Sequence, residues 1–78
     1  MKVYFENLNG FSVIEEIINV THNTRLNHLG RESLIFTTKE GKRITTEIED
    51  GDKCNKYLNE LFTGDKVTVK ENSYYTIG

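Results

Sequence analysis

The residues of this chain that could do chemistry are two histidines, a single cysteine and a few neighbouring acids. His22 and His28 fall in one polar segment, residues 21–31, and lack the i, i+4 spacing of a helical zinc pair. No cysteine nearby in the sequence completes a ligand set for them. We therefore expect exposed loop histidines, with no metal site and no cofactor.

The cysteine, Cys54, has no catalytic partners close to it in the sequence. A nucleophilic cysteine needs a base and usually a group that orients the base. The acidic pairs Glu15-Glu16 and Glu49-Asp50 are adjacent residues, and neighbours on a strand point to opposite faces. These features favour a buried, inert thiol and solvated acids, so we expect a protein that is not an enzyme.

Size and composition limit the function further. The 78 residues predict one domain, residues 1–78, with 10 basic and 12 acidic residues and a net charge of −2. This balance counts against a dedicated nucleic-acid binder, which is usually basic. The chain has neither the apolar run of a membrane helix nor the pattern of a signal peptide, which predicts a soluble cytoplasmic protein. Frequent asparagine without proline suggests an AT-rich bacterial or phage genome.

The clearest structural element is a hairpin centred on residues 39–41. Alternation of β-branched residues with other residues is typical of strands. A three-residue loop places Leu34 and Phe36 on one face with Ile44 and Ile48, whereas a two-residue loop would align them with polar residues. We therefore predict the longer loop, with Gly41 in the left-handed conformation. The opposite, unburied face is expected to carry Ile35, Thr37, Thr45 and Glu47.

A second hairpin is predicted at the end of the chain, with residues 71–73 as its loop. Val67 would then face Ile77, and Val69 would face Tyr75.

Between the hairpins, apolar residues recur at helical spacing and predict a helix near residues 53–62. Asp52 is the expected N-terminal cap and Gly64 the C-terminal glycine. The stripe expected to pack on the core is Cys54, Tyr57, Leu58, Leu61 and Phe62.

The N-terminal third has two interpretations. A capping box of Ser12 and Glu15 favours a helix, while the density of β-branched residues favours a strand. We predict a strand over residues 12–21, with an Asn9-Gly10 turn that aligns Val3 and Phe5 with Ile14. A helix over residues 12–28 would instead give a small α+β sandwich.

This order of elements predicts a mainly β fold, a small barrel of five or six strands with one short helix before the last hairpin. The helix position resembles that of an OB-type barrel, and an SH3-like barrel remains the alternative.

For function, the composition favours a non-catalytic binding module, such as a small regulator, adaptor or inhibitor with a protein partner. Long loops in compact domains are often functional, so we expect residues 21–31 to bind this partner together with a sheet edge. The expected contact residues are Arg25, Leu26, Leu29 and Arg31. The two leucines could equally plug the end of the barrel.

Two other functions stay open. The first is binding of single-stranded nucleic acid, as in OB-type barrels. Its candidate residues are Lys39, Lys42, Arg43, Lys70 and Tyr74. The second is sequestration of a nucleotide at the interface of a homo-oligomer.

Overall fold

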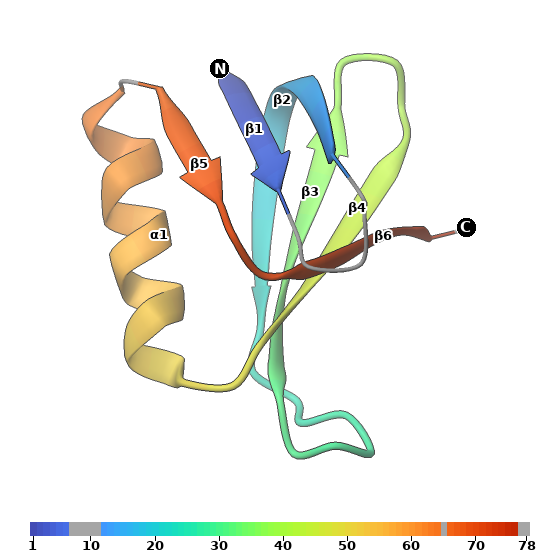
Figure 1. Cartoon of the computed structure of the whole chain (residues 1–78), viewed down its shortest axis with the longest axis vertical. Coiled ribbons are helices and arrows are strands. Elements are labelled where there is room, and N and C mark those ends of the chain that lie inside the picture. The colour runs from blue at the N-terminus through green and yellow to red at the C-terminus, as the bar shows by residue number, and fades with distance from the viewer. Residues whose placement is uncertain (7–11, 65, 77–78) are drawn as a thin grey trace.

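The computed structural model describes residues 1–6, 12–64 and 66–76, and these form six strands and one helix (Figure 1). The elements are β1 (Lys2–Glu6), β2 (Ser12–Asn23), β3 (Glu32–Thr38), β4 (Arg43–Ile48), α1 (Gly51–Thr63), β5 (Val67–Val69) and β6 (Asn72–Thr76). The predicted mainly β class, with one helix before the last two strands, is confirmed. The predicted strand over residues 12–21 is also confirmed as part of β2.

All six strands belong to one sheet in the order β5-β1-β2-β3-β4-β6. β1 to β4 form an antiparallel meander, β5 joins β1 in parallel, and β6 joins β4 antiparallel. Only Lys70 and Glu71 link the two edge strands, and such a link spans about 10 Å at most. The sheet therefore has to curl until its edges approach each other, and Figure 1 shows the resulting half-barrel beside α1.

The predicted pairing of the last two strands is wrong. Sequence analysis places Val69 opposite Tyr75, but Val69 lies opposite Phe5 of β1 and Tyr75 lies opposite Ile44 of β4. The other expected partner, Ile77, lies outside the described residues. Alternation along a short strand shows which residues are buried, but it does not show which strand lies next to it.

The central hairpin is confirmed in both register and loop length. Phe36 pairs with Ile44 and Leu34 pairs with Thr46, which places the predicted apolar residues on one face. Gly41 has a φ of 89°, the left-handed conformation that a three-residue loop requires.

The opposite face of this hairpin is more covered than predicted, because Thr45 is buried. Thr45 lies opposite Tyr74 of β6, and the Thr45 hydroxyl is 3.4 Å from the hydroxyl of Thr76. The prediction was wrong for Thr45 because it did not include β6 as the outer neighbour of β4.

The register of β1 and β2 differs by one residue from the prediction. Ile14 lies opposite Tyr4 and is 62% exposed, while Val13 pairs with Phe5. A one-residue slip moves every side chain to the other face, so Ile14 does not share the buried face of Val3 and Phe5. The predicted Asn9-Gly10 turn lies outside the described residues.

The helix begins and ends close to the predicted positions. Its N-terminal cap is Asp50, not Asp52, since the Asp50 carboxylate accepts a hydrogen bond from the Asp52 backbone N–H at 3.0 Å. Gly64 ends the helix in the left-handed conformation, as expected. The prediction of Asp52 as the cap was wrong by two residues, because the helix begins at Gly51 and the residue before it is Asp50.

The helix buries Cys54 and Leu61 in the core, with Tyr57 and Leu58 packed partly against it. Phe62 was also expected to pack there, but it is 92% exposed. At about 100° per residue it lies at the margin of the apolar stripe, where the curved sheet no longer covers it.

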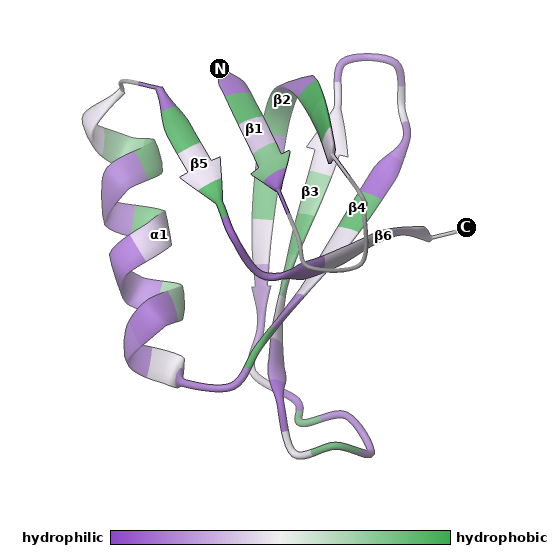
Figure 2. Ribbon diagram, in the orientation of Figure 1, coloured by the Kyte–Doolittle hydropathy of each residue, from purple (hydrophilic) through white to green (hydrophobic). Residues whose placement is uncertain are grey.

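The core lies between the curled sheet and the helix. Its largest side chains are Phe5 and Phe36, whose rings meet edge to face with centroids 5.0 Å apart. Figure 2 shows hydrophobic positions interspersed along β1, β3 and β5, while most of α1 is hydrophilic. Among the described residues, no helix has the length and apolar character needed to span a membrane.

Candidate functional site

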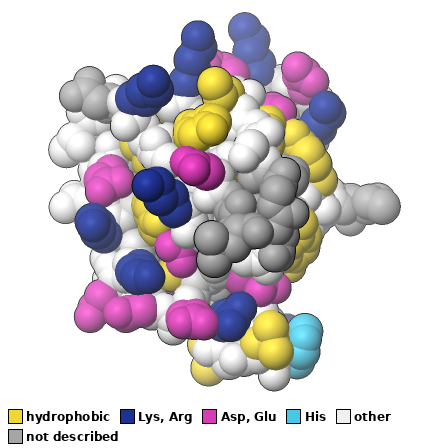
Figure 3. Space-filling model, in the orientation of Figure 1, with side chains coloured by type: hydrophobic (Ala, Val, Ile, Leu, Met, Phe, Trp, Pro, Cys, Tyr) yellow, Lys and Arg dark blue, Asp and Glu magenta, His cyan; other side chains and the backbone are white. Residues whose placement is uncertain are grey.

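The loop between β2 and β3 is the longest connection in the described part of the chain, and it protrudes from one end of the molecule (Figure 1). β2 extends to Asn23, so the predicted loop of residues 21–31 is shortened to residues 24–31, called here the β2–β3 loop. Figure 3 shows hydrophobic side chains and a histidine projecting at this end.

A single side chain organises the β2–β3 loop. The amide oxygen of Asn27 accepts hydrogen bonds from the backbone N–H groups of Leu29, at 2.9 Å, and Arg31, at 3.0 Å. The backbone N–H of Asn27 donates to the Arg31 carbonyl, and Gly30, at a φ of 74°, donates to the Asn27 carbonyl. Asparagine is suited to such turns because its short side chain can bond to the backbone of following residues.

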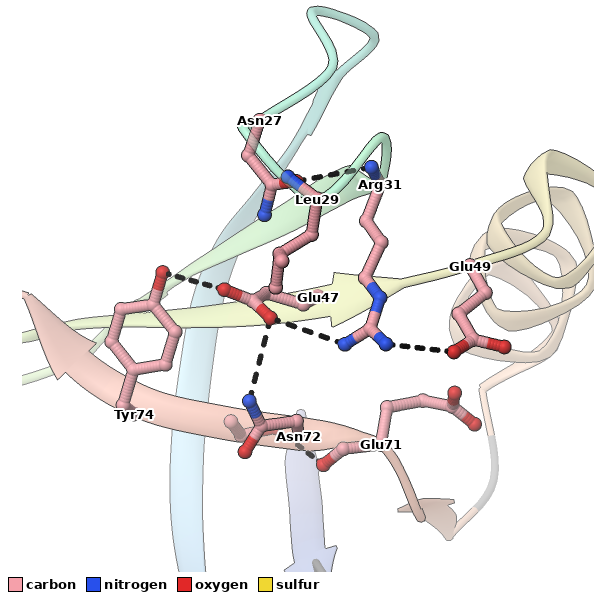
Figure 4. Close-up of polar contacts among 9 residues, drawn as sticks. Asn27, Leu29, Arg31, Glu47, Glu49, Glu71, Asn72 and Tyr74 are labelled. Carbon is pink, nitrogen blue, oxygen red and sulfur yellow. Dashed lines mark hydrogen bonds and ion pairs between the residues drawn. The ribbon is translucent and has the colours of Figure 1, made fainter.

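The base of the loop is tied to the sheet by Arg31 (Figure 4). Its guanidinium lies 2.8 Å from Glu49 and 3.6 Å from Glu47 of β4. The Glu47 carboxylate also accepts hydrogen bonds from the Tyr74 hydroxyl and the Asn72 side-chain amide of β6. The structure thus places Arg31, predicted as a partner contact, in a network that connects the loop to the edge strand.

The same network affects Tyr74. Partial burial raises the pKa of its hydroxyl, and the negative charge of Glu47 raises it further. The group therefore remains a neutral hydrogen-bond donor at physiological pH.

The two loop leucines do not plug the half-barrel. Leu26 is 60% exposed and Leu29 is 56% exposed, and Arg25 between β2 and these residues is also exposed. The backbone N–H of Arg25 donates to the Asn23 side chain, which holds the start of the loop. Three of the four predicted contact residues are therefore exposed in the β2–β3 loop.

A second exposed apolar surface lies between β2 and α1. Ile18 and Phe62 are both largely exposed and line a shallow hollow together with Met1 and Leu58. This surface was not predicted for two reasons. The predicted β1–β2 register was wrong by one residue, and Phe62 was expected to pack on the core.

The residues predicted to bind nucleic acid do not line one common hollow. Lys42 and Arg43 line a hollow with Tyr75, and the Lys42 ammonium lies 5.7 Å from the centre of the Tyr75 ring. Lys70 lines a different hollow, and Tyr74 is engaged by Glu47. Lys39 is exposed in the β3–β4 turn.

Sequence analysis missed a cluster formed by His22, Glu32 and Cys54. His22 lies on β2, partly buried, and was wrongly expected in an exposed loop; its Nε2 is 2.9 Å from Glu32 Oε1. Cys54 of α1 is fully buried, and donor atoms of the three side chains lie within 4.8 Å of one another. His28, by contrast, is exposed in the β2–β3 loop.

Burial is the main cause that raises the pKa of the Cys54 thiol, and the Glu32 carboxylate is the next. Asp50 and Glu71 raise this pKa further. A reactive cysteine is typically exposed and has a lowered pKa. The surroundings of Cys54 therefore disfavour the nucleophilic thiolate.

No protein-family model matches this sequence, and no curated protein or solved structure is significantly similar to it. The function has to be argued from the surfaces described above.

Proposed function

We propose that this protein is a non-catalytic binding module of the cytoplasm, a small bacterial or phage regulator, adaptor or inhibitor that recognises a protein partner. The binding surface is the β2–β3 loop together with the neighbouring edge strand β6. The observation that carries this proposal is the pair of exposed leucines, Leu26 and Leu29, on a backbone held by Asn27.

A held loop favours binding for an entropic reason. A flexible loop loses conformational freedom when it is immobilised on a partner, and preorganisation lowers that cost. The hydrogen bonds of Asn27 and the ion pairs of Arg31 supply this preorganisation. Leu26 and Leu29 then provide apolar contacts, and Arg25 a charged one at their side.

A stable interface takes roughly 800 Å² from each partner, so the proposed surface extends beyond the loop. The edge strand β6 enlarges the surface, because Asn72 and Tyr74 lie beside the base of the loop through their contacts with Glu47 (Figure 4). An outer strand can also pair with an extended segment of a partner.

The first prediction tests the loop. Replacing Leu26 and Leu29 together with serine is expected to weaken partner binding at least about tenfold, since hot-spot residues each contribute more than about 1 kcal/mol. The measurement is capture of the partner from a nuclease-treated lysate of the source organism, followed by titration of the isolated partner.

The control is a double replacement of Ile18 and Phe62 with serine, which removes an even more exposed pair of apolar side chains from the other surface. This variant should bind as the unmodified protein does. Loss of binding in the control with retention in the loop variant would move the interface to the β2–α1 surface and contradict the proposal.

Binding of single-stranded nucleic acid is the second candidate, favoured by the hollow in which Lys42 lies against the ring of Tyr75 beside Arg43. Bases can stack on such a ring while the cations contact phosphates. The net charge of −2 and the small size of this basic group limit the affinity.

The second prediction is therefore weak oligonucleotide binding, with a Kd in the non-specific range of about 10⁻⁴–10⁻⁶ M at physiological salt. Fluorescence anisotropy of a labelled single strand, at low and physiological salt, measures it. Submicromolar binding that is lost when Lys39, Lys42 and Arg43 are replaced with glutamine would make nucleic acid the ligand.

A further inference from the structure

Three side chains of different chemistry meet where β2, β3 and α1 come together. His22 contributes an imidazole, Glu32 a carboxylate and Cys54 a thiol, and their donor atoms lie within 4.8 Å of one another. His22 lies on β2 two residues before the β2–β3 loop, and Glu32 lies directly after the loop. Cys54 reaches the same point from the first turns of α1.

The donor set matches the preferences of one metal ion. Thiolate, imidazole and carboxylate are the three protein ligands of Zn²⁺, at about 2.0–2.3 Å, and tetrahedral geometry then puts neighbouring donors roughly 3.3–3.7 Å apart. The three donors here all lie within 4.8 Å of one another, and His22 Nε2 is 2.9 Å from Glu32 Oε1, so small side-chain movements reach that spacing. Calcium and magnesium take oxygen ligands and do not suit a thiol or an imidazole.

The surroundings also favour a cation. The carboxylates of Glu32, Asp50 and Glu71 are close enough to the Cys54 sulfur to act on it electrostatically. A bound divalent ion would offset this negative charge and stabilise the thiolate. Lys53, next to Cys54 in the helix, has its ammonium 4.0 Å from the Glu71 carboxylate and so offsets part of this negative charge.

Space for the carboxylate is created by Gly51, the first residue of α1. A Cβ atom at this position would lie 2.5 Å from Glu32 Oε2. A larger residue would therefore push the carboxylate away from the helix and from Cys54.

We propose that His22, Glu32 and Cys54 bind one zinc ion. The His22 and Glu32 side chains remain 24% and 23% exposed, so water can reach the fourth position from their side. The ion joins the helix to two strands and clamps both ends of the β2–β3 loop. Such cross-links are a common way for small domains to gain stability that a limited core does not supply.

The experiment is a titration of the full chain, reduced and without a purification tag, with Co²⁺ as a spectroscopic substitute for zinc. Tetrahedral cobalt bound to a thiolate shows a sulfur-to-metal charge-transfer band in addition to its visible bands. Because the chain has a single cysteine, that band reports ligation by Cys54 alone. We expect one equivalent of cobalt to produce the band and one equivalent of zinc to remove it.

Variants locate the other two ligands. His22→Gln and Glu32→Gln are each expected to weaken cobalt binding at least about tenfold, the range found for changes at and around metal ligands. The matched control is His28→Gln, which changes the other histidine of the chain and should bind as the unmodified protein does. Circular dichroism without metal checks that each variant is folded.

The absence of a charge-transfer band in the folded, unmodified protein would overturn the proposal, whatever the behaviour of the variants. The proposal would also be overturned if His22→Gln and Glu32→Gln bind cobalt as tightly as the unmodified protein. Loss of the charge-transfer band in His28→Gln would overturn it as well. If a variant does not fold, the thermal melting temperature of the unmodified protein tests the proposal instead. Zinc should raise this temperature, and a chelator added beforehand should prevent the rise. No rise with zinc would contradict the proposal.

Discussion

Replacing Phe36 with alanine is expected to lower the free energy of unfolding by about 3–5 kcal/mol, the largest stability effect we predict for one substitution. Phe36 is fully buried, and its ring packs edge to face against Phe5 of β1. Removing the ring loses its transfer free energy and leaves a cavity between the central hairpin and β1. Denaturant-induced unfolding, followed by circular dichroism, measures this change.

The chain itself offers the control. Phe62 carries the same side chain but is 92% exposed, so Phe62→Ala should change stability by no more than about 0.5 kcal/mol. Equal losses for the two variants would contradict the placement of the core.

A domain of 78 residues has a total stability of only about 4–12 kcal/mol. Phe36→Ala could therefore leave too little folded protein to measure. Phe36→Leu keeps most of the volume and is expected to lose less than Phe36→Ala, with a cost of about 1–2 kcal/mol. A loss below about 1 kcal/mol for Phe36→Ala itself would place Phe36 on the outer face.

The second large effect is expected where β6 joins β4. Thr46 and Ser73 are both buried, and their hydroxyl oxygens lie 2.8 Å apart. Either hydroxyl can donate in this bond, and the Ser73 hydroxyl also lies 3.1 Å from the Glu71 carbonyl oxygen. Ser73→Ala removes one partner and leaves the buried Thr46 hydroxyl without this hydrogen bond, at a cost of about 1–3 kcal/mol.

A double-mutant cycle separates this cost from other effects. Thr46→Val combined with Ser73→Ala removes both hydroxyls and should be more stable than Ser73→Ala alone, because no buried donor remains. Additive losses would show that the two residues do not interact. That result would contradict the pairing of β6 with β4, which sequence analysis did not predict.

The part of the fold that could be predicted is the part specified by residues close together in the chain. The β3–β4 hairpin follows from parity, since only one loop length places Phe36 with Ile44. The helix likewise follows from apolar spacing and from Gly64 at its end.

The partners of β5 and β6 could not be predicted, because β5 has only three residues and both of its valines would be buried against any neighbour. The β1–β2 register failed for a related reason. Both Ile14 and Val13 are apolar, so parity could not decide which of them faces Phe5.

For the candidate sites too, features formed by residues close together in the chain were easier to predict than those formed by distant segments. The position of Leu26 and Leu29 in a loop could be predicted from their polar surroundings in the sequence. Their exposure could not, because the sequence left open that they plug the end of the barrel. The cluster of His22, Glu32 and Cys54 could not, because it forms only when α1 docks on the sheet. The useful signal was the continuation of the strand pattern from Val20 to His22, which takes His22 out of the loop.

The parallel pairing of β1 with β5 has a consequence for how the chain folds. Val3 meets Val67, and the Tyr75 hydroxyl meets Glu15 across 60 residues. Contacts this distant close long loops and cost chain entropy before they add stability, so folding should be slow, on the order of milliseconds to seconds. On the ribosome, the β1–β4 meander then emerges with both edges unpaired, and it stays open to wrong partners until β5 and β6 have been synthesised.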